Sequence, residues 1–255
     1  MRQKISILGC GWLGMPLALT LVNKGFTVNG STTSKNKFNK LKREGVLPYL
    51  IELDNLESNI CEFLDAEILI ITVPSKNIDN FKNLITKIKK SNIKKVLFIS
   101  SSSVYPNLNQ LATEETTVKK SPLSEIEILF KLNTIFKSTI LRFSGLFGYD
   151  RKPGEFIKNN KKIEKPEGYV NLIHRDDCIK IIELIIKRNT WNEILNACAD
   201  THPKSRDFYT KECLKLGKNV PIFNENSLNN YKIVSTEKLK LLLDFKFKYS
   251  DLMKY

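Results

Sequence analysis

Histidine and cysteine are scarce in this chain of 255 residues, and their placement excludes two kinds of stabilising site. The two histidines are far apart and have no carboxylates at ligand spacing, so we expect no metal. The five cysteines are odd in number and none has CxxC spacing, so we expect neither a disulfide framework nor a zinc site. Free thiols fit a reducing compartment, and we expect a cytoplasmic protein.

Long apolar runs are also missing, and no stretch reaches the length of a membrane span. The start of the chain imitates a signal peptide, because Arg2 and Lys4 precede a largely apolar run. Gly9 and Gly11 break that run and no small-residue cleavage site follows. We therefore expect no membrane partner.

Arginine is rare, although the formal charge is +14. Only 7 of the 41 basic residues are Arg, and the 34 Lys are spread along the chain. Nucleic-acid binders more often carry Arg-rich patches and aromatic platforms, so we expect no nucleic-acid partner. The charge would still attract anionic small molecules.

Short apolar strands alternate with helical segments in the first 143 residues. Strands are predicted at 4–8, 26–30, 49–53, 67–73, 95–100 and 139–143, and helices at 12–24, 35–44, 77–90 and 125–132. Such alternation is typical of βαβ units with right-handed crossovers. The predicted fold class is α/β, a Rossmann-type doubly wound parallel sheet with a small C-terminal substrate lobe.

The pattern loosens after about residue 145. Strands at 170–173 and 193–196 and a helix at 175–187 would return to the sheet, and a further helix is predicted at 205–216. We therefore predict an NAD(P)-binding domain over 1–145, with returning elements at about 170–196. Residues 146–169 and 197–255 would form the substrate lobe.

The segment from Gly9 to Gly14 reads GCGWLG, a GxGxxG motif between a strand and a helix. The first glycine permits the tight turn, Gly11 admits a pyrophosphate, and Gly14 allows close helix–strand packing. The helix N-terminus adds N–H donors for phosphate. We therefore predict that this loop, including Trp12 and Leu13, binds a dinucleotide.

The end of the second strand favours NADP over NAD. An acid about 18 residues after the third glycine binds the ribose in NAD enzymes, but that position is Thr32. The neighbouring Thr33 and Ser34 are hydroxyl residues, and Lys35 and Lys37 follow. Hydroxyls and ammonium groups suit a 2′-phosphate. NADP is the preferred cofactor and NAD the alternative.

The fifth strand runs into Ser100-Ser101-Ser102-Ser103-Val104-Tyr105. Here the sequence resembles the extended short-chain dehydrogenase/reductase (SDR) family, in which a Ser or Thr lies three residues before a Val-Tyr pair. The resemblance implies that Ser101 polarises an oxygen of the substrate. The family's YxxxK helix would place its catalytic Tyr near residue 126, where this chain has no Tyr. Ordinary proton transfer coupled to hydride transfer would lack its acid/base.

Further motifs narrow the resemblance to atypical SDR proteins of the YeeZ type, which commonly lack YxxxK. The motifs are GWLGMPLA at 11–18, SSSSVYP at 100–106, LRFSGLFG at 141–148, NLIHRDD at 171–177 and LNACADTHPKSRDFY at 195–209. The resemblance implies a nucleotide-sugar epimerase/dehydratase or reductase that acts on a small anionic substrate. A non-catalytic NADP(H)-binding sensor is the alternative. Relatives in the family often form homodimers.

Five further residues are candidates for the chemistry. Tyr105 is the nearest phenol to Ser101 and is a candidate proton donor, although this Tyr packs beside the sheet in many relatives. His174 is a second catalytic candidate, while the Asp after it would cap the next helix. The candidate substrate contacts are Arg151, His202 and Arg206.

Overall fold

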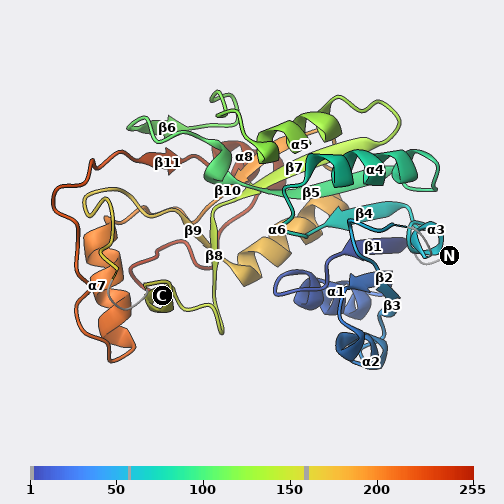
Figure 1. Cartoon of the computed structure of the whole chain (residues 1–255), viewed down its shortest axis with the longest axis horizontal. Helices are drawn as coiled ribbons and strands as arrows, with labels where there is room; N and C mark the ends of the chain where they lie inside the picture. The colour runs from blue at the N-terminus through green and yellow to red at the C-terminus, as the bar shows by residue number, and fades with distance from the viewer. Residues whose placement is uncertain (1–2, 57–58, 158–160) are drawn as a thin grey trace. The chain divides into compact units, whose positions relative to one another are not determined.

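The computed structural model describes residues 3–56, 59–157 and 161–255. Its largest feature is a seven-stranded parallel sheet with the strand order β10-β7-β5-β4-β1-β2-β3 (Figure 1). The order reverses between β1 and β4, as in doubly wound folds that bind ligands at the carboxyl ends of the strands. The predicted fold class is confirmed. The strands are β1 (Lys4–Leu8), β2 (Thr27–Thr32), β3 (Leu47–Leu50), β4 (Ile68–Ile71), β5 (Lys95–Ser101), β7 (Lys137–Phe143) and β10 (Ile194–Ala197).

Helices connect the strands. Those of the sheet are α1 (Gly14–Asn23), α2 (Lys35–Arg43), α3 (Ile60–Phe63), α4 (Ile78–Lys89), α5 (Pro122–Lys131) and α6 (Arg175–Arg188). In Figure 1, α4 and α5 lie side by side along β5, whereas α1 and α2 lie beside β1 to β3. The start of α4 is stabilised by Asn77, whose side chain accepts hydrogen bonds from the amides of Asp79 and Asn80.

Aromatic side chains fix α4 and α5 onto the sheet. Phe98 of β5 stacks on Phe130 of α5 with ring centroids 4.9 Å apart. Phe81 of α4 meets both rings edge-on, at 5.6 and 6.1 Å. All three side chains are fully buried, and their T-shaped and stacked contacts add to the stabilisation that comes from burying apolar area. The four residues of β4 are also buried, as expected for a central parallel strand.

The chain divides into two compact units. The first comprises Met1–Ser100, Lys120–Leu141 and Ile182–Ile194, and the second comprises Ser101–Lys119, Arg142–Ile181 and Leu195–Tyr255. The second unit has its own apolar cluster, which includes Phe147, Leu172 and Phe208. The division into an NAD(P)-binding domain over 1–145 and a substrate lobe stays a prediction.

The second unit contains short elements, most of which the sequence pattern missed. They are β6 (Gln110–Ala112), β8 (Gly145–Phe147), β9 (Leu172–His174), β11 (Lys232–Val234), α7 (Ser205–Lys215), α8 (Glu237–Leu243) and the 3-10 turns η1 (Ser102–Val104) and η2 (Pro153–Glu155), of which only β9 and α7 were predicted. Strand β6 pairs with β11, and β8 pairs with β9. Three-residue strands show no periodicity, and their partners lie far away in the chain. Among the helices within the described ranges, none is both long and apolar enough to cross a membrane.

Candidate cofactor and substrate sites

The glycine loop lies at the carboxyl end of β1 and is fixed to both neighbouring strands. The amide of Gly9 donates to Ser31 Oγ at 2.8 Å, and the amide of Cys10 donates to the Ser31 carbonyl at 2.8 Å. On the other side, Thr72 Oγ1 donates to the Gly9 carbonyl at 2.6 Å. Ser31 and Thr72 were not predicted as loop supports, because nothing in their own sequence context marks them.

The three glycines of the motif face different surroundings. A Cβ on Gly14 would lie 2.2 Å from the carbonyl oxygen of Gly9, and Gly9 itself has φ +102°. Both positions therefore require glycine. At Gly11, by contrast, a Cβ would meet no described atom within 4 Å. The open side of the loop is thus at Gly11, where the motif predicts that a pyrophosphate approaches.

Helix α1 begins at this loop without a side-chain cap. Leu13 occupies the N-cap position and makes no capping hydrogen bond, and the first turn carries no acidic residue. The backbone N–H groups of the first turn therefore have no side-chain acceptor from the N-cap residue. The first turn also carries no carboxylate that would repel a phosphate. Trp12 is half-buried and Leu13 is buried. A loop open at Gly11 and an uncapped helix start fit the pyrophosphate of a dinucleotide.

The carboxyl end of β2 presents hydroxyl and ammonium groups. Thr32 is buried, and its Oγ1 accepts a hydrogen bond from the Ser34 amide at 3.1 Å. Thr33 and Lys35 are exposed. Burial raises the pKa of the Cys10 thiol to about 12, while a backbone hydrogen bond with Ser31 and, to a smaller extent, the Lys37 ammonium oppose that rise. Lys37 is therefore near the Cys10 side chain of the glycine loop, in the same unit.

A polar hollow of about 370 Å³ lies within the second unit. Ser101, Ser102 and Ser103 line it at the end of β5, and the other walls come from distant parts of the chain. These are Asn107, Gly145, Glu164, Lys165, Gly168, Tyr169, Asn171, Ser205, Asn230, Tyr231 and Lys232. Ser101 Oγ accepts a hydrogen bond from the Ser103 amide at 3.1 Å, which caps η1. The hollow can bind a polar ligand against the Ser101 hydroxyl.

Tyr105 is enclosed in a buried polar cluster and does not line this hollow. Its hydroxyl donates to Asn196 Oδ1 at 2.8 Å and accepts from Arg142 Nη1 at 2.6 Å. Burial raises the pKa of the phenol, and Arg142 opposes that effect. These hydrogen bonds give the Tyr105 hydroxyl a structural role, and its catalytic role stays a prediction.

His174 lies among aromatic rings of the second unit. Its ring centroid is 3.7 Å from that of Tyr249 and 5.3 Å from that of Phe147. Its Nδ1 accepts a hydrogen bond from the Asp176 amide at 3.2 Å. Burial lowers the pKa of the imidazole, which Asp176 counteracts, so the ring is neutral near pH 7. The catalytic role of His174 stays a prediction.

The three predicted substrate contacts lie in different environments, and none lines the hollow among the described residues. Arg206 is held by Glu167 at 2.9 Å and by both carboxylate oxygens of Glu225 at 2.7 and 3.1 Å. Arg151 is exposed, and its backbone pairs with Gly148. Burial lowers the pKa of His202.

Helix α5, where the SDR motif would place its Tyr and Lys, carries a carboxylate instead. Glu127 is buried and accepts a hydrogen bond from Ser100 Oγ at 2.5 Å. This pair lies in the first unit and ties α5 to the end of β5. The helix therefore supports the strand that leads into Ser101, and its sequence contains no phenol.

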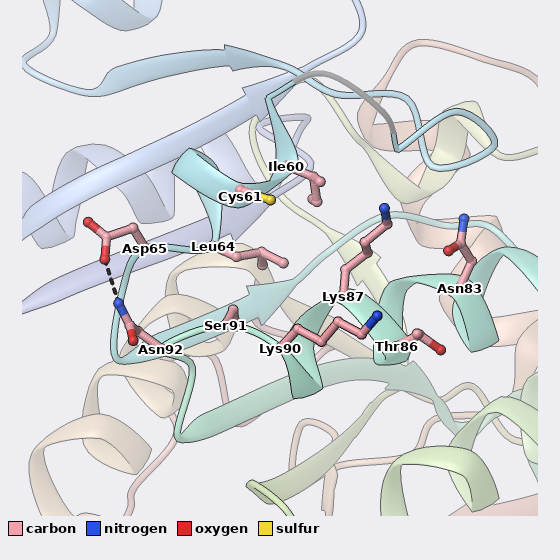
Figure 2. A pocket seen from close by; sticks show the side chains of 10 residues that line it. All are labelled: Ile60, Cys61, Leu64, Asp65, Asn83, Thr86, Lys87, Lys90, Ser91 and Asn92. Carbon is pink, nitrogen blue, oxygen red and sulfur yellow. Dashed lines mark hydrogen bonds between the residues drawn. The ribbon is translucent and has the colours of Figure 1, made fainter.

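Figure 2 shows another hollow, of about 450 Å³, in the first unit. Residues of α3 and α4 line it together with Leu64, Asp65 and the segment 90–92, and the Asn92 amide donates to Asp65 at 2.8 Å. It lies where α4 ends and β4 and β5 begin. Because doubly wound sheets bind ligands at the opposite, carboxyl ends of their strands, we assign no ligand to it. In the described parts of the chain, no three His, Cys, Asp or Glu side chains are grouped to hold a metal.

Comparisons with known proteins agree with the geometry of the glycine loop. The NAD binding domain of 6-phosphogluconate dehydrogenase matches residues 4–124. Protein YeeZ of Escherichia coli strain K12 is 31% identical over 271 residues, which covers 98% of this chain and 97% of YeeZ.

Two solved structures share the fold at low sequence identity. The UDP-glucuronic acid 4-epimerase of Bacillus cereus, in complex with NAD, has a TM-score of 0.79 at 16% identity over 99% of this chain and 95% of its own. An SDR superfamily protein of Agrobacterium tumefaciens with bound NAD has a TM-score of 0.76 at 14% identity, over 99% and 94%.

Proposed function

This chain belongs to the YeeZ family and is an NAD(P)-binding protein of the epimerase/dehydratase-like SDR type, and from that premise we propose that it is an enzyme acting on a nucleotide sugar. The observation that carries the proposal is the polar hollow beside Ser101, at the end of a strand of a dinucleotide-binding sheet. The B. cereus epimerase supports it as a structural relative whose name specifies a nucleotide sugar.

In the proposed reaction, the Ser101 hydroxyl donates a hydrogen bond to the sugar oxygen whose carbon changes oxidation state. The hydride would be supplied or accepted by bound NAD(P). The polar walls of the hollow, among them Asn107, orient the sugar hydroxyls. The reaction is an epimerisation, a dehydration or a reduction.

We propose NADP as the preferred cofactor. The support is the absence of a carboxylate over residues 31–37, together with two lysines, Lys35 and Lys37, in that segment. An ammonium group beside the ribose would form a charge-assisted hydrogen bond with a 2′-phosphate. With the neutral 2′-hydroxyl of NAD, it would bind no more strongly than a neutral donor. We also propose that the protein is cytoplasmic, which the five free cysteines support. We further propose that it forms a homodimer, as relatives in the family often do.

The test combines binding with turnover. Calorimetric titration should give a lower Kd for NADP than for NAD, and the cofactor at 100 times its Kd should stabilise the protein by about 2.7 kcal/mol. UDP-glucose and UDP-glucuronate are then incubated with the protein and cofactor, and the products are separated by chromatography. Ser101→Ala should lower kcat by about 10²-fold or more while cofactor Kd is unchanged. Full activity in Ser101→Ala would refute the assigned role.

A second candidate is a non-catalytic NADP(H)-binding sensor. The observation that favours it is α5, which places Glu127 against Ser100 and carries no Tyr. Under this hypothesis, cofactor binding is tight but no nucleotide sugar turns over in either direction. Such a result, with NADP bound, would replace the enzymatic proposal.

A further inference from the structure

Lys232 is a cation of the polar hollow that has no carboxylate partner among the described residues. Its ammonium donates to the Tyr105 carbonyl at 3.1 Å and to Asn107 Oδ1 at 3.3 Å. An ammonium group has three N–H donors, so one donor remains for a ligand. Both acceptors are neutral oxygens, and the positive charge is therefore not compensated by them.

The fold places Lys232 in the hollow by several backbone contacts. Strand β11 pairs with β6, and Lys232 is opposite Gln110 in the register. The Asn171 side chain donates to the Lys232 carbonyl at 2.9 Å and accepts from the Val234 amide at 3.0 Å. The position of this lysine is thus determined by a strand and by Asn171, which itself lines the hollow.

The electrostatic surroundings of the hollow are positive. Lys165 also lines it, while its one carboxylate, Glu164, accepts hydrogen bonds from Asn224 Nδ2 at 3.0 and 3.1 Å. Burial lowers the pKa of Lys232, and the positive charges of Lys119 and Lys165 add to that effect. A half-buried cation near other cations gains free energy when an anion binds beside it.

Arg206, in the same unit, is the opposite case. Its guanidinium is bound by the carboxylates of Glu167 and Glu225, which satisfy its charge and most of its donors. An incoming anion would have to displace those carboxylates. The uncompensated Lys232 is therefore the better-placed cation for a ligand.

We propose that Lys232 is the anchoring residue for the anionic group of the substrate, a phosphate or carboxylate oxygen that accepts its remaining N–H within the hollow. This inference rests on the proposed function and deepens it, because it identifies the residue that selects an anionic substrate. Lys165 supports the same anion from the wall of the hollow, and Ser101 contacts the reacting part of the same molecule.

The experiment compares Lys232→Met and Lys232→Gln with Lys246→Met, an exposed lysine of the same unit whose loss changes the net charge equally. The Gln variant retains N–H donors toward Tyr105 and Asn107 but removes the charge, so it controls for a packing defect. Thermal unfolding verifies that each variant is folded. The Kd values of UDP-glucose, UDP-glucuronate and NADP are measured by calorimetry at about 50 and 200 mM salt, because screening changes between these conditions.

We expect both Lys232 variants to weaken UDP-glucose binding at least tenfold and to flatten its salt dependence, while Lys246→Met changes it less than twofold. NADP affinity should stay within twofold in all three variants. An equal loss for both sugars assigns the diphosphate as the anchored group, and a larger loss for UDP-glucuronate assigns its carboxylate.

The inference is overturned if a folded Lys232→Gln binds UDP-glucose as wild type does, or if the wild-type protein binds neither sugar nucleotide. After the first result, turnover by the wild-type protein still decides the proposed function. The second result also removes the nucleotide sugar as the proposed substrate. The proposed function fails instead if UDP-glucose binds through Lys232 and no turnover occurs with any cofactor.

Discussion

The glycine loop and the polar hollow are built in opposite ways. The loop occupies six consecutive residues, Gly9 to Gly14, and takes its supports from the ends of adjacent strands. The hollow gathers residues from five separate parts of the chain, from Ser101 to Lys232. The difference shows that the predicted dinucleotide loop is a local motif, whereas the hollow that we propose as the substrate site depends on long-range pairing.

The largest expected effect is that of substituting Gly14, which tests whether the backbone of the glycine loop alone determines its shape. Gly14→Ala would force a Cβ to 2.2 Å from the Gly9 carbonyl oxygen. We expect about 1–3 kcal/mol of lost stability and roughly 100-fold weaker dinucleotide binding. Denaturant unfolding and calorimetric titration measure the two effects.

Gly11→Ala is the matched control, because its Cβ would meet no described atom within 4 Å. Its stability should remain within about 0.5 kcal/mol of wild type. Dinucleotide binding should still weaken about tenfold, since the pyrophosphate approaches there. Unchanged binding in Gly11→Ala would contradict our placement of the pyrophosphate.

Tyr105→Phe tests the buried cluster of the second unit. The substitution removes the hydroxyl that contacts Arg142 and Asn196 and leaves both polar groups without that partner. We expect a loss of about 1–3 kcal/mol in the free energy of unfolding. Tyr231→Phe is the control, because its hydroxyl has no hydrogen bond among the described residues, and it should change stability by less than about 0.5 kcal/mol.

Tyr105→Phe also tests whether Tyr105 transfers a proton in catalysis. If Tyr105 only supports the structure, kcat of folded Tyr105→Phe should remain within a few-fold of wild type. A loss of about 10²-fold or more would instead assign it the proton transfer.

Charge at the end of β2 should produce a smaller effect. The double substitution Lys35→Ala/Lys37→Ala should weaken NADP binding about tenfold, or 1.4 kcal/mol, and leave NAD binding unchanged. Lys40→Ala/Lys42→Ala removes equal charge from the other end of α2 and should alter neither Kd. If both double substitutions weakened NADP binding equally, the effect would come from the overall positive charge of α2. Lys35 and Lys37 would then not explain the preference for NADP.

The smallest effect is expected from His174, whose pKa is lowered in the folded state mainly by burial. The folded protein then binds fewer protons than the unfolded chain as the pH falls through the unfolded pKa, about 6.5. Stability is therefore complete above that pH and decreases toward acid.

Denaturant unfolding at pH 7.5, 6.5 and 5.5 should show a decrease of up to about 1 kcal/mol from this residue, and His174→Gln should reduce that decrease. His202 also has a lowered pKa, so some pH dependence should remain in the variant. An unaltered slope in His174→Gln would exclude His174 as a source.

Much of the sheet could be predicted from the sequence. The expected strand at 4–8 matches β1, and the helix expected at 77–90 matches α4 within one residue at each end. These elements carry their own signal, because apolar periodicity and flanking breakers lie within each segment. The short strands β6, β8 and β11 carry no such signal and exist only through their partners.

The sequence by itself determined the Rossmann-type sheet and the glycine loop. Strand periodicity and the spacing of three glycines are properties of adjacent residues, and backbone sterics convert them into structure directly. Only the tertiary structure decided which cation could receive a ligand. Nothing in the neighbouring sequence distinguishes Lys232 from the other 33 lysines. In the folded protein, however, Arg206 pairs with carboxylates, whereas Lys232 contacts only neutral oxygens among the described residues. Compensation of charge depends on what lies within a few ångströms in space, and local sequence does not encode it.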